Sequence, residues 1–291
     1  MISTLLGSAI FGRKHIIGLV VSIIAIVVTL LVCHFVFRNK SEKTKIWVLR
    51  TFAIIILVVE FIKQTLILSH GKTIGLSTYP INLCHTALIV FPLVAFGGQN
   101  NKFANFFKPY TFCIPLIAGI MTLVYPSNVL GDGEYWFGNG EYLPIISFIY
   151  HSIMIIFPLY MVISKFYKPK PIDALWAGLT VFGYSIFISI YNVIVKYDFC
   201  FLGDASSSPF KFIYDKAGWF GHYLLLLSIG LACLALIYLP TFIKHWKLKS
   251  KLKNQTVKLQ EINSSQKITE PNLIEIEEKI QTDNNKNKKP E

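Results

Sequence analysis

Residues 16–37 read IIGLVVSIIAIVVTLLVCHFVF, an apolar run of 22 residues in which His34 is the one ionisable side chain. A helix that crosses a lipid bilayer needs about 20 consecutive, mostly apolar residues, so this run is long enough to span a membrane. It is too long for the apolar core of a cleaved signal peptide, and no small-residue cleavage motif follows it. We therefore expect it to form the first transmembrane helix.

Six further apolar runs follow along the chain, separated by short clusters of charged residues. They comprise residues 46–69, 79–96, 109–124, 143–163, 174–195 and 219–243. The whole chain is 53% hydrophobic and only 15% charged, whereas a soluble domain carries about 25% charged residues. This composition excludes a soluble globular domain. The seven runs predict an all-α, polytopic membrane protein with seven transmembrane helices.

The composition changes after residue 243, where Lys, Asn, Glu and Gln replace the apolar residues. The last 48 residues have no apolar periodicity long enough to bury a helix face. We therefore expect a transmembrane domain over residues 1–243 and a polar, Lys-rich tail over residues 244–291 that is mostly disordered or loosely helical. The basic start of this tail, KHWKLKSKLK from Lys244, either contacts anionic lipid or fixes the topology.

The Lys and Arg residues of the loops indicate the orientation in the membrane. With seven spans, 14 of them fall on one side and 5 on the other, whereas omission of the weak 109–124 span leaves no bias. Cytoplasmic loops are enriched in Lys and Arg, so we expect the N-terminus outside and the C-terminus in the cytoplasm. The net charge of +12 then belongs to loops and tail rather than to a nucleic-acid surface. The Lys-, Asn-, Ile- and Phe-rich composition suggests a multi-pass protein of a bacterial cell membrane.

In this orientation the polar side chains of the spans gather in the outer half of the membrane. An ionisable residue inside a span is costly and indicates a functional site by default. Glu60, Lys63 and Gln64 share one helix face because they are spaced i, i+3 and i+4. Asn82 lies near the outer start of its run, and Asn192 lies one turn from the outer end of its own. These five residues are candidates for a binding site.

Cys84 and His151 lie at nearly the same expected depth. Each follows a proline that suits the first turn of its helix, Pro80 and Pro144 respectively. At about 1.5 Å per residue, Cys84 lies roughly 6 Å and His151 roughly 10 Å below these prolines. The two could act as a thiol nucleophile and its base, because the thiolate is the reactive form of cysteine. Alternatively, Cys84 is a small buried apolar residue and His151 is a hydrogen-bonded core histidine.

Other polar residues also allow more than one interpretation. Glu60 and Lys63 could bind a head group, relay protons or form a structural ion pair. His85, His151 and His222 could hold a metal ion with Glu60, but no metal-ligand spacing supports this, and we expect no metal. The five cysteines are scattered along the chain without a CxxC pair, so they indicate neither a disulfide framework nor a zinc site.

Three short motifs carry a resemblance to a known family. YPINLCH at residues 79–85 is similar to the Pro-x-x-x-Cys element of the YwaF-type bacterial membrane proteins, whose eukaryotic relatives include transmembrane protein 164. HSIMIIFPLY at residues 151–160 resembles the histidine element of that family, and SIYNVIVKYDF at residues 189–199 resembles the segment before its last helix. The resemblance covers roughly residues 45–240, with little contribution from the first helix. Asn82 departs from the family pattern, in which a histidine or another polar group is expected.

The eukaryotic branch of this family implies a lipid acyltransferase that moves a fatty acyl chain between phospholipids, with Cys84 and His151 as its catalytic pair. The implied mechanism is ping-pong, in which a thioester on the cysteine passes its acyl group to a lysophospholipid or, in a hydrolase, to water. The side chains available to bind the substrate are Glu60, Lys63, Gln64, Asn82 and Asn192. Of these, Lys63, Gln64, Asn82 and Asn192 could donate hydrogen bonds to its oxyanion. The expected partners are phospholipids or lysophospholipids, and no cofactor is required.

The competing interpretation is a small-solute transporter or a substrate-binding membrane component. Glu60, Lys63, His151 and Asn192 would then bind a solute in a pocket that opens to the outside. No helix repeat and no pair of corresponding helices broken by Gly or Pro is apparent in the sequence, and this counts against a transporter. An acyl adduct trapped on Cys84 would separate the enzyme from the carrier.

Overall fold

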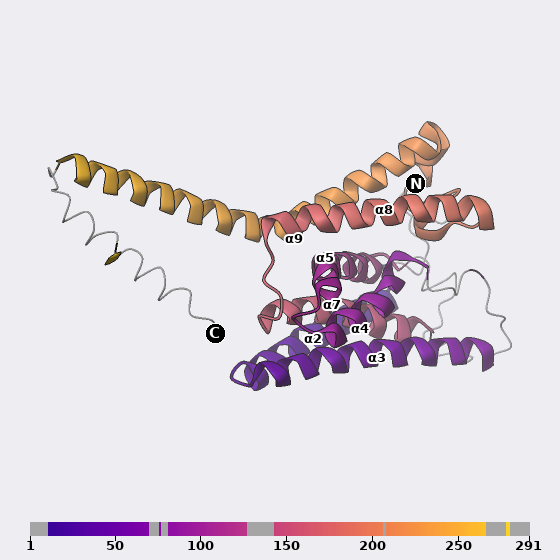
Figure 1. The fold of residues 1–291 in the computed structure, drawn as a ribbon. Helices are drawn as coiled ribbons and strands as arrows, with labels where there is room; N and C mark the ends of the chain where they lie inside the picture. Colours follow the sequence, from indigo (N-terminus) through magenta and orange to yellow (C-terminus); the bar gives the residue numbers. More distant parts are fainter. Residues whose placement is uncertain are drawn as a thin grey trace. The chain divides into compact units, whose positions relative to one another are not determined.

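The computed structural model describes residues 11–69, 76, 81–126, 143–205, 208–265 and 278–279. Contacts divide the chain into two units, Met1–Leu239 and Pro240–Glu291. All regular secondary structure in the described residues is helical (Figure 1). The elements are α2 (Arg13–Phe37), α3 (Glu42–Ser69), the 3-10 helix η2 (Leu83–Thr86), α4 (Ala87–Gly97), α5 (Lys102–Val124), α7 (Leu143–Ile163), α8 (Pro171–Val195), the 3-10 helix η3 (Phe199–Phe201) and α9 (Lys211–Ser265).

Each of the seven predicted apolar runs forms a helix, so the predicted all-α membrane architecture is confirmed. In the described part of the chain, six helices are long and apolar enough to cross a membrane, and Leu83–Gly97 forms a shorter apolar helix. The six are α2, α3, α5, α7, α8 and α9. The placement of the N-terminus outside rests on the charge bias alone and stays a prediction.

The third helix starts later than the sequence predicts. We expected a regular helix from residue 79, but Ile81 and Asn82 form a turn and a bend, and the first helical residues form the 3-10 turn η2. Pro80 lies outside the described residues. The helix ends where Gly98 adopts a φ of 75°, in the left-handed region that glycine tolerates. Together, η2 and α4 are about 24 Å long, which is less than the ~30 Å thickness of the hydrocarbon core. At most one end of this element can therefore reach a membrane surface.

The fourth helix is longer than the apolar run that predicts it. We expected residues 109–124, whereas α5 begins at Lys102. The side-chain oxygen of Asn101 accepts hydrogen bonds from the backbone N–H groups of Phe103 and Ala104, at 2.9 and 3.2 Å, and so caps the new first turn. Farther along, the ammonium group of buried Lys108 lies 4.3 Å from the ring centroid of Phe166, which offsets part of the cost of its burial.

Helices α5 and α7 form the centre of the first unit. Helix α7 packs against α2, α3 and α5, and α5 also packs against α4 and α8. In the most hydrophobic segments of α5 and α7, 67% of the residues are buried, whereas the corresponding value for α2 and α3 is 22%. Helices α2 and α3 therefore expose large apolar surfaces. A Cβ added at Gly119 would lie 3.0 Å from the carbonyl oxygen of His151, which shows how closely α5 approaches α7. The site described below lies beside this contact.

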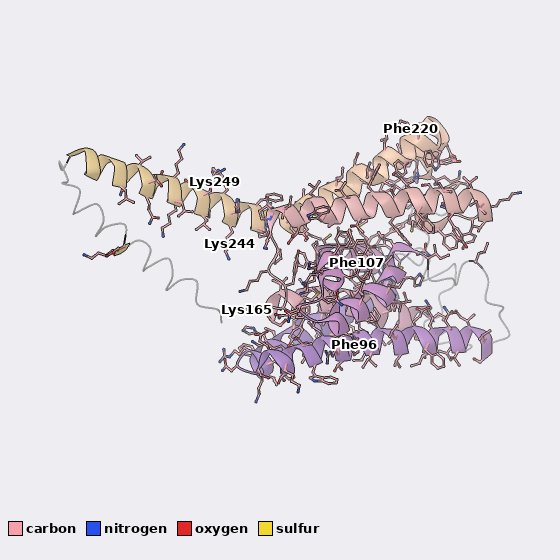
Figure 2. The ribbon with its side chains drawn as sticks, in the orientation of Figure 1. Phe96, Phe107, Lys165, Phe220, Lys244 and Lys249 are labelled. Atoms are coloured by element: carbon pink, nitrogen blue, oxygen red, sulfur yellow. The ribbon has the colours of Figure 1, made fainter. Side chains whose placement is uncertain are left out.

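The last helix, α9, contains the boundary between the two units, because it runs from Lys211 to Ser265 and the boundary follows Leu239. Within the first unit it is interrupted at Gly218, which has a φ of 67°. In the second unit it continues through residues 244–265, where we expected a disordered or loosely helical tail. Its side chains from residue 244 to residue 259 are exposed, and Figure 2 labels Lys244 and Lys249 among them. Lys, Leu, Gln and Glu are good helix formers, and neither Gly nor Pro interrupts this stretch.

Candidate functional site

An ion pair on α3 forms one side of a polar network inside the first unit. The Nζ atom of Lys63 lies 2.6 Å from Oε2 of Glu60, and Nε2 of Gln64 donates a hydrogen bond of 2.7 Å to Oε1 of the same carboxylate. Only 8% of the surface of Glu60 is exposed. The three residues therefore share one helix face, as their i, i+3, i+4 spacing predicts.

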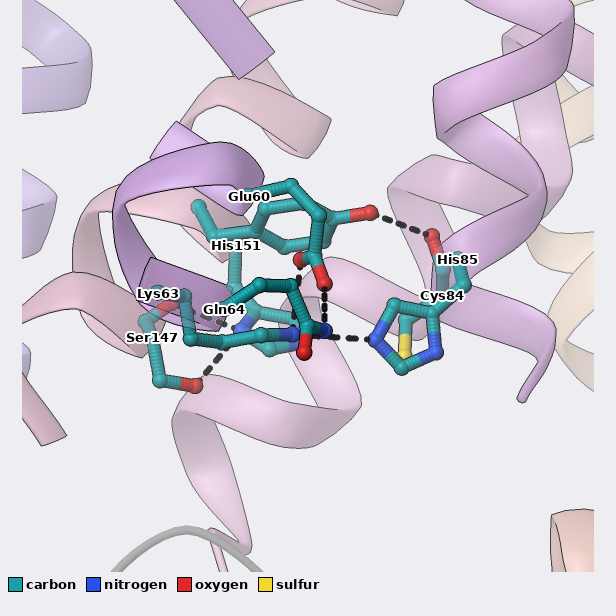
Figure 3. A network of polar contacts seen from close by, with 8 residues as sticks. Glu60, Lys63, Gln64, Cys84, His85, Ser147 and His151 are labelled. Atoms are coloured by element: carbon teal, nitrogen blue, oxygen red, sulfur yellow. Dashed lines mark hydrogen bonds and ion pairs between the residues drawn. The ribbon is translucent and has the colours of Figure 1, made fainter. Parts of the chain in front are cut away.

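His85, on the 3-10 turn η2, extends this network. The ammonium group of Lys63 lies 3.3 Å from Nε2 of His85, and Figure 3 shows the lysine extending between Glu60 and the imidazole ring. A lysine ammonium group can only donate, so Nε2 of a neutral His85 must accept and its proton must lie on Nδ1. Nδ1 is buried and has no hydrogen-bond partner among the described residues. The ring thus presents a free N–H donor.

His151, on α7, presents the opposite kind of group. Its Nδ1 atom lies 2.7 Å from the carbonyl oxygen of Ser147 and 3.2 Å from the Ser147 hydroxyl (Figure 3). A carbonyl oxygen can only accept, so Nδ1 carries the proton and Nε2 of the neutral ring keeps its lone pair. Nε2 is buried and, within the described ranges, has no partner. This is the tautomer that a general base requires.

Tyr150 joins the cysteine turn to α7. Its hydroxyl group donates a hydrogen bond of 3.2 Å to the carbonyl oxygen of Cys84, and its ring centroid lies 5.3 Å from that of the neighbouring His151. The thiol of Cys84 is close enough to interact electrostatically with Lys63 and Glu60, and the ring of His151 interacts with the same two groups. Both residues therefore lie near the Glu60–Lys63 ion pair, and no hydrogen bond joins the Cys84 thiol to Nε2 of His151.

The two asparagines predicted for the site have other partners. The Asn192 side chain pairs with the backbone of Phe199, donating to its carbonyl oxygen at 2.9 Å and accepting from its N–H at 3.0 Å. Oδ1 of Asn82 accepts a hydrogen bond of 3.2 Å from the backbone N–H of Cys200. Both residues hold η3 in place, Asn192 from α8 and Asn82 from the turn before η2. The structure does not bring Asn192 into the network of Glu60 and Lys63.

Cys200 occupies this same turn, outside the apolar spans. Burial raises the pKa of its thiol to about 12, although the backbone N–H of Leu83 lowers it somewhat. The thiolate fraction of Cys200 at neutral pH is therefore very small. A cysteine in this state is a poor nucleophile.

Sequence reasoning missed three residues of the network. His85 was considered only as a metal ligand, whereas it accepts a hydrogen bond from Lys63. Ser147 lies four residues before His151, and this i, i+4 spacing on one helix could have revealed it. No sequence signal indicates the contact of Tyr150 with Cys84, because it joins elements 66 residues apart.

The histidine of α9 at position 222 is not part of the network. Nε2 of His222 lies 2.8 Å from the Ser208 hydroxyl group, which in turn accepts a hydrogen bond from the N–H of Phe210. The Ser208 hydroxyl group thus links His222 of α9 to the backbone just before that helix. No group of three or more His, Cys, Asp or Glu side chains in the described ranges could hold a metal ion.

Comparison with known proteins agrees with the extent of the first unit. The model of the TMEM164 family matches residues 10–239, and this range ends at the last residue of the first unit, Leu239. The match includes the first helix, to which the sequence motifs contribute little, and every residue of the polar network. No curated protein and no solved structure matches the chain. The seven apolar helices and this match over most of the chain identify it as a membrane protein that belongs to the TMEM164 family.

Proposed function

We propose that this protein moves a fatty acyl group of a membrane phospholipid, with Cys84 as the nucleophile and His151 as its base. One observation carries the proposal: the 2.7 Å contact between His151 Nδ1 and the carbonyl oxygen of Ser147 leaves a buried Nε2 lone pair without a partner among the described residues. A thiol needs such a base to become an effective nucleophile. The cysteine turn is held to the same helix by Tyr150.

The first half-reaction transfers the acyl group to the enzyme. Nε2 of His151 takes the proton of the Cys84 thiol, and the sulfur attacks the carbonyl carbon of a phospholipid ester. The carbon–oxygen bond to the glycerol then breaks, and His151 returns the proton to the departing alkoxide. A lysophospholipid leaves, and a thioester remains on Cys84.

The second half-reaction releases the acyl group. The hydroxyl group of a lysophospholipid, or water in a hydrolase, attacks the thioester while His151 accepts its proton. The carbon–sulfur bond breaks, and the thiolate takes the proton back from His151. Neither half-reaction requires an oxidant, a reductant or a cofactor.

His85 supplies the donor that the negatively charged oxygen of each tetrahedral intermediate needs. Lys63 holds the ring in the tautomer with the proton on Nδ1, next in sequence to the nucleophile. A donor that is already oriented and buried stabilises a developing oxyanion far more than one that must first leave water. The sequence suggested Lys63, Gln64, Asn82 and Asn192 for this role. However, Asn192 is hydrogen-bonded to the backbone of Phe199, and Lys63 forms an ion pair with Glu60.

The setting of the site fits a substrate that is itself a membrane component. The helices around it expose mainly large apolar side chains, so a lipid reaches it without crossing water. The Lys and Arg bias of the loops supports an N-terminus outside the cell membrane, which places the network in the outer half. The composition further supports a bacterial source.

The test is acyl exchange between phospholipids catalysed by purified protein in liposomes. Cys84→Ser and His151→Gln should each remove most of the activity, and the double variant should cost little more, because the two residues act as a unit. Cys113→Ser, a substitution of a cysteine outside the polar network, is the matched control and should keep the activity. Full activity in Cys84→Ala would instead favour a carrier that binds a solute at Glu60, Lys63 and His151.

A further inference from the structure

A cavity of about 230 Å³ lies among α5, α8 and α9, next to η2 and η3, and is separate from the polar network. Among the residues that the structure describes, no charged side chain lines it. The hydroxyl groups in its wall already have partners: Ser185 and Tyr223 bond to each other at 2.8 Å, and Tyr184 donates to the carbonyl oxygen of Ile81. The wall therefore offers a ligand apolar surface rather than hydrogen bonds, which suits a hydrocarbon.

The cavity is long. Along α9 its lining extends from Tyr223 to Leu234, which is roughly 16 Å at 1.5 Å per residue. Along α8 it extends from Gly178 to Ser185. A site that follows two helices for this length fits an extended chain better than a compact solute.

Two hydrogen bonds hold α9 to neighbouring helices. Tyr223 bonds to Ser185 of α8, and the Tyr238 hydroxyl donates to the carbonyl oxygen of Pro109 at 3.3 Å. Between them, Leu231 lines the cavity and is 52% exposed. The wall of the cavity on α9 thus includes an exposed apolar side chain.

One end of the cavity reaches the turn that carries Cys84. Leu83 lines the cavity, whereas His85 reaches Lys63 of the polar network. A 3-10 helix has three residues per turn, so three consecutive side chains point in directions about 120° apart, and Cys84 lies between the other two. Cys200, on η3, also lines the cavity.

We propose that this cavity binds one hydrocarbon chain of a membrane lipid, with the carboxyl end of the chain at Cys84. The identification of that chain as the transferred acyl chain rests on the proposed function, whereas binding itself does not. The polar network receives the ester, and the cavity holds the chain attached to it.

Gly230 allows the cavity to be filled without disturbing its wall. It lines the cavity, and a Cβ added there would meet no atom within 4 Å. Gly230→Leu should therefore occupy the space intended for the chain. Gly183→Leu is the matched control, because Gly183 also lies on a helix, has equally open surroundings and does not line the cavity.

The experiment uses full-length protein in vesicles of phosphatidylcholine that carries a diazirine in the middle of one acyl chain. It is performed on the Cys84→Ala background, so that no reaction consumes the probe. Crosslinks should concentrate in peptides of residues 178–185 and 223–234, relative to peptides of α2. Exclusion of even two methylene groups weakens apolar binding about tenfold, so Gly230→Leu should lower cavity labelling by about tenfold or more, whereas Gly183→Leu should not.

Two results would overturn the proposal. One is equal labelling of α2 and the cavity peptides in the protein that retains Gly230, which does not depend on whether either glycine variant folds. The other is undiminished cavity labelling in a Gly230→Leu protein that elutes and melts like its parent. If the cavity is labelled but the wild type shows no acyl exchange, the cavity binds a chain and the proposed acyl transfer is wrong. If acyl exchange occurs without labelling of the cavity, the acyl transfer stands and the proposed chain-binding site is wrong.

Discussion

The ammonium group of Lys63 lies 3.3 Å from Nε2 of His85, and the same lysine forms an ion pair of 2.6 Å with Glu60. This arrangement fixes which nitrogen of His85 carries the proton. It leaves Nδ1–H buried and without a partner in the described part of the chain, one residue from Cys84. The ion pair therefore has a chemical consequence beyond helix packing, because it orients a donor beside the proposed nucleophile.

Substitution of His85 tests this consequence. His85→Phe keeps a ring of similar shape but removes the donor, so kcat for acyl exchange should fall about 10²–10³-fold with little change in KM. His85→Asn, whose side-chain amide can donate again, should recover part of the loss. Steady-state kinetics in liposomes provide the measurement. A rise in KM together with a fall in kcat, with no difference between Phe and Asn, would assign His85 a packing role.

Substitution of Asn192 separates folding from chemistry. Asn192→Ala leaves the buried N–H and carbonyl groups of Phe199 without their side-chain partner, which should cost about 2–4 kcal/mol of stability. The folded fraction should keep its kcat, because Asn192 lies outside the network. Thermal unfolding in detergent and kinetics at low temperature measure the two effects. A large loss of kcat without a change in stability would instead indicate that Asn192 contributes to the active site, which is the role that the sequence predicts for it.

The raised pKa of Cys200 predicts a pH dependence of its alkylation. With a pKa of about 12, the thiol should react slowly with maleimide at pH 7, and the rate should rise about tenfold per pH unit up to pH 10, because only the thiolate reacts. The protein for this measurement has serine at the other four cysteines. Its control places the single cysteine at exposed Lys211 instead. A rate that levels off near pH 8–9 for Cys200 would contradict the pKa shift.

The orientation can be tested on intact cells. In a cysteine-free background, Lys211→Cys should react with a membrane-impermeant maleimide, and Lys249→Cys should react only after the cells are permeabilised. The reason is the Lys and Arg bias of the loops, which places the end of the chain inside. The reverse pattern would invert the topology and move the polar network to the inner half of the membrane.

Much of the fold could be predicted because an apolar run of about 20 residues has few alternatives to a membrane helix. The run at residues 143–163 coincides with α7. The start of α5 could not be predicted from hydropathy, because Lys102 and Lys108 lower the apolar signal, whereas Asn101 sets the start through its side-chain cap. The 3-10 start of the third helix was missed because Pro80 is typical of a regular first turn.

The candidate site was only partly predictable. Spacing along one helix correctly grouped Glu60, Lys63 and Gln64, since a helix has a fixed period. Depth in the membrane suggested Asn192 as well, but depth does not determine which way a side chain points, and Asn192 bonds to the backbone of the next turn. The tautomers of His85 and His151 depend on tertiary and local contacts, which no sequence pattern shows.

The most direct test of the central claim is the mass of the Cys84 peptide after the protein is mixed with phospholipid and quenched in acid. The account predicts a thioester, seen as the mass of one acyl chain added to Cys84 and removed by neutral hydroxylamine. The adduct should be absent or strongly reduced in His151→Gln and should persist in Cys113→Ser. Acyl exchange at full rate with no adduct on Cys84, or with Cys84→Ala as active as the wild type, would contradict the claim.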